Sequence, residues 1–139
     1  MTEADEPVAR ILPAVTEEDL PYAVAASQGV LAMARCASCA RWARPPADRC
    51  PGCGGPVEPQ AVSGLGTVFS CTVNEHPFNP AVPLPFVVAI VVLDEQEDLR
   101  LVSNVVNCDP HAVTIGMRVR VVFEQQGARH YPLFEPAAD

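Results

Sequence analysis

Two pairs of cysteines stand out, because each pair has the spacing at which two thiolates can hold one metal ion. Cys36 and Cys39 form the first pair, and Cys50 and Cys53 form the second after ten intervening residues. Two sulfurs three positions apart in a tight turn supply half of a tetrahedron, and a second such turn completes it. Zn²⁺ takes four thiolates at roughly 2.3 Å, so the doubled spacing predicts a closed, structural zinc ribbon.

Three alternatives to zinc stay open for these cysteines. A rubredoxin-like iron site uses the same four ligands, a disulfide pairing conflicts with the reducing cytoplasm in which we expect the chain, and the spacing could be coincidental. The segment between the two cysteine pairs holds Trp42, Pro45 and Pro46 but almost no aliphatic side chains, so burial alone cannot fold it and a metal is the expected source of stability. Gly54 gives the second turn its backbone freedom, whereas Ala40 follows the first, which we expect to be slightly irregular.

The two remaining cysteines have a simpler interpretation. Cys71 and Cys108 stand singly among or beside apolar residues, which predicts small, buried side chains. A cysteine nucleophile would need a histidine partner, and His76 and His111 are near them only in sequence. We assign no catalytic residue, because no Ser-His-Asp order, glycine-rich phosphate loop or pair of catalytic carboxylates stands out.

A loop and a strand supply the weaker binding candidates. His76 and Phe78 lie in a polar and aromatic loop after a predicted strand, and we take them as candidate substrate or partner contacts; the alternative is a rigid, exposed loop. Arg120, which alternates with valines together with Arg118, is a third candidate contact. Those two arginines either meet an anionic ligand or line a solvated strand face.

The elements that must position these residues divide the chain into three parts. We expect an N-terminal arm and helix in residues 1–29, a rubredoxin-like zinc ribbon in residues 30–59 and an OB-fold barrel in residues 60–139. The helix should start at Thr16 or Asp19 and end at Gln28-Gly29, after a loose arm over residues 1–15. Strands are predicted at residues 67–73, 86–93, 99–106, 118–124 and 131–134.

These strands predict a mainly β fold. Five short strands favour a closed barrel, which hides strand edges, and the 15 prolines disfavour a helical bundle. Residues 107–115 lie where a five-stranded OB-fold barrel carries its connecting helix. The predicted order is therefore a short helix, a four-cysteine zinc ribbon and a five-stranded OB-fold barrel.

Composition excludes several classes of function. The 139 residues carry a net charge of −8, and their nine basic residues are all arginine, so no lysine is present for a Schiff base or a phosphate loop. The acidic balance disfavours nucleic acid. The longest apolar run, residues 86–93, is far shorter than the ~20 residues of a membrane span, and the acidic start lacks a signal-peptide pattern. We expect a cytoplasmic protein without membrane or nucleic-acid partners.

An ordered set of short motifs runs through residues 16–137. Its members are Arg35-Cys36-Ala37-Ser38-Cys39, Pro45-Pro46, Cys50-Pro51-Gly52-Cys53, Gly64-Leu65-Gly66-Thr67-Val68, Thr72-Val73-Asn74-Glu75-His76, the stretch from Pro85 to Asp94, Asn104, Ile115-Gly116-Met117 and Leu133-Phe134-Glu135-Pro136. The set resembles a family of acyl-CoA-associated proteins with a rubredoxin-like zinc ribbon and an OB fold, catalogued as domain of unknown function thirty-five. The chain departs from it at Ala40, where glycine is usual, and at Glu135, where a basic residue is common.

The resemblance implies an accessory role. Members pair with a thiolase-like (lipid-transfer-protein-like) enzyme in a hetero-oligomer, and their barrel helps to form an acyl-CoA site shared with that partner. Residues 86–110 look most like members associated with retro-aldol cleavage of steroid side-chain CoA thioesters, in which the partner carries the acid–base residues. The hypothesis is therefore a non-catalytic, zinc-binding subunit of an aldolase or thiolase complex in steroid or lipid metabolism.

Two alternatives belong to other classes. A single-stranded nucleic-acid-binding ribbon and OB module would need a basic groove with stacking aromatics, and salt-dependent retention of an oligonucleotide would reveal it. A rubredoxin-like iron electron carrier would be red and would bleach on reduction, whereas a colourless protein with stoichiometric zinc would exclude it.

Overall fold

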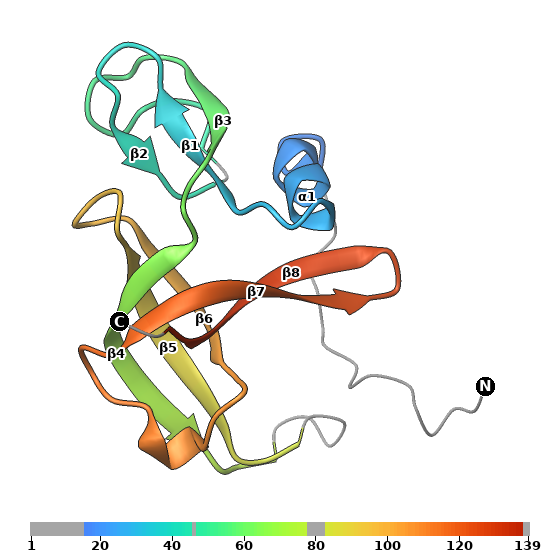
Figure 1. The fold of residues 1–139 in the computed structure, drawn as a ribbon. Coiled ribbons are helices and arrows are strands. Elements are labelled where there is room, and N and C mark those ends of the chain that lie inside the picture. Colours follow the sequence, from blue (N-terminus) through green and yellow to red (C-terminus); the bar gives the residue numbers. More distant parts are fainter. Residues whose placement is uncertain (1–15, 46, 78–82, 138–139) are drawn as a thin grey trace.

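The computed structural model describes residues 16–45, 47–77 and 83–137, and it shows a small sheet above a closed β-barrel (Figure 1). The elements in chain order are α1 (Leu20–Ser27), β1 (Ala32–Cys36), β2 (Trp42–Ala43), β3 (Val57–Ala61), β4 (Leu65–Asn74), β5 (Phe86–Leu93), β6 (Arg100–Val105), a 3₁₀ turn η2 (Pro110–Ala112), β7 (Arg118–Gln126) and β8 (Arg129–Pro136). The mainly β fold with one short helix and a five-stranded barrel is confirmed.

The helix α1 begins where its sequence predicts. Asp19 is its N-cap and accepts a 2.9 Å hydrogen bond from the Thr16 hydroxyl, and Pro21 lies in the first turn, where a missing N–H breaks no helical bond. Its apolar face is weak, since Ala26 alone is buried while Val24 is 48% exposed. The helix lies beside β1 and β8 (Figure 1). The arm predicted over residues 1–15 lies outside the described residues.

The small sheet is built around β1. Strands β2 and β3 pair with it antiparallel on either side, so Ala34 faces both Ala43 and Pro59. The small side chains of Ala34 and Ala43 let the strands pack closely, and β1 is buried along most of its length. The strand ends at Cys36, which places the first cysteine pair at the tip of the sheet, in the turn that leads to β2.

The barrel closes in the order β4-β5-β6-β8-β7, with β4 paired to β7 and β6 running parallel to β8. Glycine is required where β4 bends into it: a Cβ at Gly66 would lie 2.6 Å from the Val92 carbonyl oxygen. At Gly64, φ is +83°, and a Cβ would lie 2.5 Å from the Cγ1 of Val121. The close contact of β4 with β5 and β7 therefore depends on these two missing side chains.

Ribbon and barrel share one hydrophobic core. Leu31, Met33 and Trp42 of the ribbon side belong to the same buried cluster as the barrel side chains Val68, Val87, Ala89, Val91, Leu93, Leu99, Val105, Val113, Val119 and Phe134. Trp42 is only 7% exposed and fills the space between the two parts. The ribbon is thus seated on the barrel by burial, and its small sheet needs no separate apolar core.

Most predicted strands form close to their predicted limits. β5 matches residue for residue, β6 is one residue shorter at each end, and β4, β7 and β8 extend beyond the prediction. The connection over residues 107–115 carries only the η2 turn, so the expected connecting helix is wrong. Pro110 starts that turn and Asp109 caps it, but Val113 is already extended. None of the helices in the described ranges combines the length and apolar character that crossing a bilayer requires.

Candidate metal centre and its junction with the barrel

The four paired cysteines come together in two matching turns. The Ala40 N–H donates to the Cys36 carbonyl at 3.0 Å, and the Gly54 N–H donates to the Cys50 carbonyl at 2.9 Å. Ala40 and Gly54 both take a left-handed backbone, with φ of 68° and 76°. The expected irregularity of the first turn is therefore wrong: Ala40 adopts the conformation for which glycine is preferred, at a steric cost.

The sulfurs themselves fit a tetrahedral ion. All four Sγ atoms lie within 4.8 Å of one another, and the closest approaches are 3.5 Å for Cys36 with Cys53 and 3.6 Å for Cys39 with Cys50. A tetrahedron with Zn–S bonds of about 2.3 Å has edges of about 3.8 Å, close to these separations. Four thiolates leave no open position for water, so such an ion would hold the fold together and would not activate a substrate.

Backbone amides prepare the site for negative charge. Ser38 and Cys39 donate their N–H groups to the Sγ of Cys36 at 3.3 and 3.4 Å, and Gly52 and Cys53 donate to the Sγ of Cys50 at 3.3 and 3.5 Å. The chain also packs tightly against the site, since a Cβ at Gly55 would lie 2.9 Å from the Ser38 hydroxyl oxygen and 3.2 Å from the Cys36 sulfur. These are the features of a site shaped around thiolates.

The thiols also share their protons unequally. The backbone N–H groups of Cys39 and Ser38 lower the pKa of Cys36 to about 6. The Gly55 amide acts to lower the pKa of Cys53, but the sulfurs of Cys36 and Cys39 outweigh it and raise that pKa to about 12. Four thiols this close cannot all ionise without a cation. A divalent ion that prefers sulfur supplies the missing charge, and its binding releases protons.

A turn of the barrel holds the ribbon in place. The side chain of Gln96, between β5 and β6, accepts the Trp42 N–H and donates to the Trp42 carbonyl, both at 2.9 Å. Asp98 of the same turn pairs with Arg41 and accepts from Gln96 at 2.7 Å. Glu95 accepts the Ser63 N–H at 2.7 Å, where the chain leaves the ribbon.

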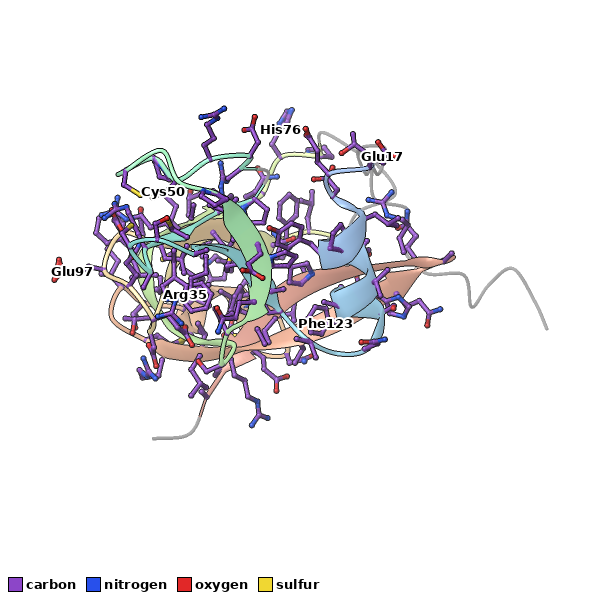
Figure 2. The ribbon with its side chains drawn as sticks, turned by 90° about the horizontal axis from the view of Figure 1, so that it is seen from above. Glu17, Arg35, Cys50, His76, Glu97 and Phe123 are labelled. Carbon is purple, nitrogen blue, oxygen red and sulfur yellow. The ribbon has the colours of Figure 1, made fainter. Side chains whose placement is uncertain are left out.

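Figure 1 shows this turn rising from the barrel toward β2. Seen from above in Figure 2, Cys50 and Arg35 lie on one side of the molecule, away from Phe123 beside α1, and Glu97 of the turn points outward. The Arg35 guanidinium lies 4.7 Å from the centre of the Trp42 ring, so the indole lies between this cation and the barrel core. From the sequence alone, residues 94–98 are predicted only as an acidic turn. The signal that could have drawn attention to it is the single amide, Gln96, with two carboxylates on each side.

Comparison with known proteins then gives the family. Two family models match consecutive parts of the chain: "ChsH2, rubredoxin-like zinc ribbon domain" over residues 23–58 and "ChsH2, C-terminal OB-fold domain" over residues 59–124. A relative in Methanothermobacter thermautotrophicus, described as a DUF35 domain-containing scaffold protein, is 35% identical over 94 residues, which are 66% of this chain and 69% of the relative. This chain belongs to the DUF35 family. Its metal centre is the four-cysteine cluster of a zinc ribbon domain.

Solved structures agree. The DUF35 chain matches a chain of the Ltp2-ChsH2(DUF35) aldolase with 36% identity and a TM-score of 0.82, over 91% of this chain and all of that one. A DUF35 protein of unknown function from Sulfolobus solfataricus has the same fold at 13% identity and a TM-score of 0.64. The likenesses favour neither a nucleic-acid module nor an iron electron carrier.

Two curated relatives are much longer. The probable enoyl-CoA hydratase alpha subunit of Thermomonospora curvata is 36% identical over 138 residues, which are 98% of the DUF35 chain but 43% of the relative. The 3-oxo-4,17-pregnadiene-20-carboxyl-CoA hydratase alpha subunit of Mycobacterium tuberculosis is 40% identical over 68 residues, 49% of this chain and 21% of the relative. The DUF35 chain therefore spans less than half the length of both.

The other candidate contacts are not gathered at the metal centre. His76 follows the end of β4, which lies at the far end of the barrel from the ribbon, and its N–H donates to the Asn74 side chain at 3.4 Å (Figure 1). Arg120 donates to Glu135 at 2.7 Å, and Arg118 makes two 2.7 Å bonds to Asp94. Both arginines are thus paired within the fold. Phe78 lies outside the described residues.

The two single cysteines are half-buried and pack against the core cluster. Cys71 lies 3.9 Å from the Val113 carbonyl, and burial raises the pKa of Cys108. His111 lies 3.5 Å from a carboxylate oxygen of Glu75. A raised thiol pKa is the opposite of what a cysteine nucleophile needs, in line with the interpretation of Cys108 as a packing residue.

Proposed function

We propose that this chain is a zinc-stabilised, non-catalytic subunit that assembles with a thiolase-like enzyme and helps to form its acyl-CoA site. Its ribbon holds Zn²⁺ on Cys36, Cys39, Cys50 and Cys53, and the complex cleaves or forms a carbon–carbon bond in a CoA thioester. The steroid side-chain retro-aldol reaction is the chemistry that we favour. The observation that carries the proposal is the match to the whole length of a chain of the Ltp2-ChsH2(DUF35) aldolase.

An apolar outer face of the barrel supports assembly. Strand β5 alternates between fully buried and half-buried residues, and both sets are apolar. Its outward side chains Val88, Ile90 and Val92, with Val102 of β6 and Phe69 of β4, form what we call the β5 face. Ile90 pairs with Val102, which is 62% exposed, and Phe69 is 48% exposed. A strand that is apolar on both sides is typical of one covered on both sides.

The aromatic residue of this face is in contact with an arginine. The Arg100 guanidinium of β6 lies 4.1 Å from the centre of the Phe69 ring of β4. Phe69 lies where the β4–β5 register shifts between Val68 and Ser70, and such an irregularity re-aims a side chain. The face also carries polar residues, since Ser70 lies opposite Ile90 and Asn104 lies opposite Val88. An aromatic ring beside an arginine, on a face that also presents valine and isoleucine, has the composition of an interface centre.

The described residues contain few groups that could act as catalytic residues. Within residues 16–45, 47–77 and 83–137, the one group of three or more metal-ligating side chains is the cysteine quartet, whose closed geometry leaves no reactive position. The two strand arginines are committed to carboxylates. An acyl-CoA shared with a partner that supplies the acid–base groups agrees with this distribution.

The deciding experiment is co-purification. The affinity-tagged chain is expressed in its native host, and stoichiometric partners are identified by mass spectrometry, with metal content measured on the same sample. A thiolase-like protein at a fixed ratio, with one zinc for each chain, is the expected result. A monodisperse monomer that leaves every thiolase-like protein encoded nearby unbound would overturn the assignment.

A further inference from the structure

Positive charge is concentrated on the ribbon of an otherwise acidic protein. Residues 35–57 contain four arginines and a single carboxylate, that of Asp48, while the rest of the chain has five arginines and sixteen carboxylates. Solubility alone does not require such a separation. A local excess of guanidinium groups on a protein of net charge −8 creates one surface at which anions can gather.

Three of these arginines surround a depression where ribbon and barrel meet. Arg41, Arg44 and Arg49 line it, with Trp42, Pro51 and Leu99 among the other lining residues, and it encloses about 420 Å³. The three arginines are exposed whereas Trp42 and Leu99 are buried, so guanidinium groups form its rim and apolar side chains its floor, with Gln96 and Asp98 among the lining residues from the barrel. A volume of this size is within the range of about 300–1,000 Å³ that small-molecule sites occupy.

Charge in the depression is only partly compensated. Arg41 pairs with Asp98 of the barrel turn. In the part of the chain that the structure describes, Arg44 and Arg49 have no carboxylate partner, and both side chains are exposed. Backbone pairing nevertheless keeps them near the depression, because Arg44 directly follows β2 and Arg49 forms an isolated bridge with Pro56. Two planar donors held at one rim suit the oxygens of phosphate groups.

We propose that this arginine-rimmed depression binds the phosphorylated adenosine end of a coenzyme A thioester. The inference deepens the proposed function and rests on it, since it gives the shared acyl-CoA a point of attachment on this chain. The phosphates would contact Arg44 and Arg49, and the base would lie on the apolar floor near Trp42. Arg41 is already paired with Asp98 of the barrel turn and would not contact the phosphates; it would hold the wall of the depression nearest the barrel in place.

Trp42 provides the readout, because it is the only tryptophan of the chain and lines the depression. The zinc-loaded full chain is titrated at near-physiological salt with coenzyme A, dephospho-coenzyme A, adenosine 3′,5′-bisphosphate and pantetheine. We expect a saturable change in Trp42 emission with coenzyme A and the bisphosphate, weaker binding of the dephospho form, and no effect of pantetheine. Calorimetry repeats the comparison on the complex with its enzyme partner.

Matched variants test which arginines act. Arg44→Gln and Arg49→Gln should each weaken coenzyme A binding about tenfold, the loss expected for one charge-assisted contact. Arg129→Gln removes the same charge from the β7–β8 hairpin and should leave binding unchanged. Zinc content and melting temperature are checked for all three variants, so that a folding defect is not mistaken for lost binding.

Several results would overturn the inference. They are equal binding of pantetheine and coenzyme A, an equal loss in Arg129→Gln, and the absence of any dependence on Arg44 or Arg49 in both the free chain and the complex. Tighter, arginine-dependent binding of a single-stranded oligonucleotide would assign the depression to nucleic acid. Normal coenzyme A binding with loss of the enzyme partner in Arg44→Gln and Arg49→Gln would make it a protein interface. If the partner co-purifies while nucleotide binding fails, the proposed function stands and this inference alone is lost.

Discussion

Gln96 pairs with both backbone groups of Trp42, although the two residues are 54 positions apart. One primary amide thus satisfies the N–H and the C=O of the first residue of β2, as a neighbouring strand would. The bonded residue is also the one whose ring fills the core shared by ribbon and barrel. Burial and hydrogen bonding at Trp42 therefore both hold the ribbon in one orientation.

Removing this amide should loosen the ribbon. Gln96→Ala leaves two backbone groups of a buried residue without partners, so we expect the free energy of unfolding to fall by about 2 kcal/mol. Equilibrium urea unfolding followed by Trp42 fluorescence measures it. Glu97→Ala changes the adjacent, outward-pointing residue and should alter stability by less than about 0.5 kcal/mol. Equal effects of the two substitutions would show that the Gln96 bonds are not stabilising.

The two cysteine turns predict opposite effects of exchanging alanine and glycine. Ala40→Gly relieves a left-handed alanine and should stabilise the zinc-bound ribbon by about 0.5–1 kcal/mol, after allowance for the greater freedom of glycine when unfolded. Gly54→Ala should destabilise it by about 1 kcal/mol through backbone strain alone, because a Cβ there meets nothing within 4 Å. Zinc release to a competing chelator at fixed pH ranks the proteins. Faster release from Ala40→Gly than from the unmodified chain would contradict the prediction.

Sequence patterns predict the parts of this protein that depend on local spacing. The metal ligands can be predicted because each pair of cysteines lies within one turn; they are Cys36, Cys39, Cys50 and Cys53. Strand β5 can be predicted because its eight consecutive apolar residues leave few alternative structures. The Asp94–Asp98 turn is different. Its composition is that of an ordinary acidic turn, and its role arises from residues such as Arg41 and Trp42 that only the fold brings near.

The strand arginines illustrate the same limit. Alternation on β7 correctly predicts that Arg118 and Arg120 share a face, but not that Asp94 and Glu135 lie opposite them. Such pairing depends on which strands become neighbours in the closed barrel. The connection over residues 107–115 fails for another reason: position in a general OB-fold plan suggests a helix, whereas Asp109-Pro110 and the following Val113 permit one short turn.

Charge placed on the β5 face should prevent assembly. Val102→Glu would bury an unpaired carboxylate if the partner covers this face, and we expect its affinity for the proposed thiolase-like partner to fall by at least ~100-fold, about 3 kcal/mol. Because Val102 is largely exposed in the chain alone, zinc content and melting temperature should change little. Sedimentation or size-exclusion analysis of the mixed proteins measures complex formation.

The matched control for this surface is Val24→Glu. Val24 is 48% exposed on α1, and the substitution adds the same charge at a different surface. Full assembly of Val24→Glu beside failure of Val102→Glu would locate the interface on the β5 face. Undiminished binding of Val102→Glu would remove this face from the proposal while leaving the identity of the partner open to the co-purification test.

Asp94 should make the barrel sensitive to acid in a defined direction. Arg118 donates two hydrogen bonds to this carboxylate and lowers its pKa below the ordinary value. A depressed folded-state pKa stabilises the fold above the unfolded-state pKa, and the contribution is lost as the pH falls through the folded value. Asp94→Asn should therefore be less stable than the unmodified chain at pH 7, by about 0.5–1 kcal/mol for a pair this exposed.

The difference in the free energy of unfolding between the two proteins should shrink below about pH 4. Denaturant unfolding repeated across pH measures it. Acid affects the metal centre in both proteins alike, so this effect cancels in the difference. The control is Glu97→Gln, which removes an outward-pointing carboxylate, and its free energy of unfolding should follow that of the unmodified chain at every pH. A gap between Asp94→Asn and the unmodified chain that persists unchanged at low pH would mean that the ion pair is not its source.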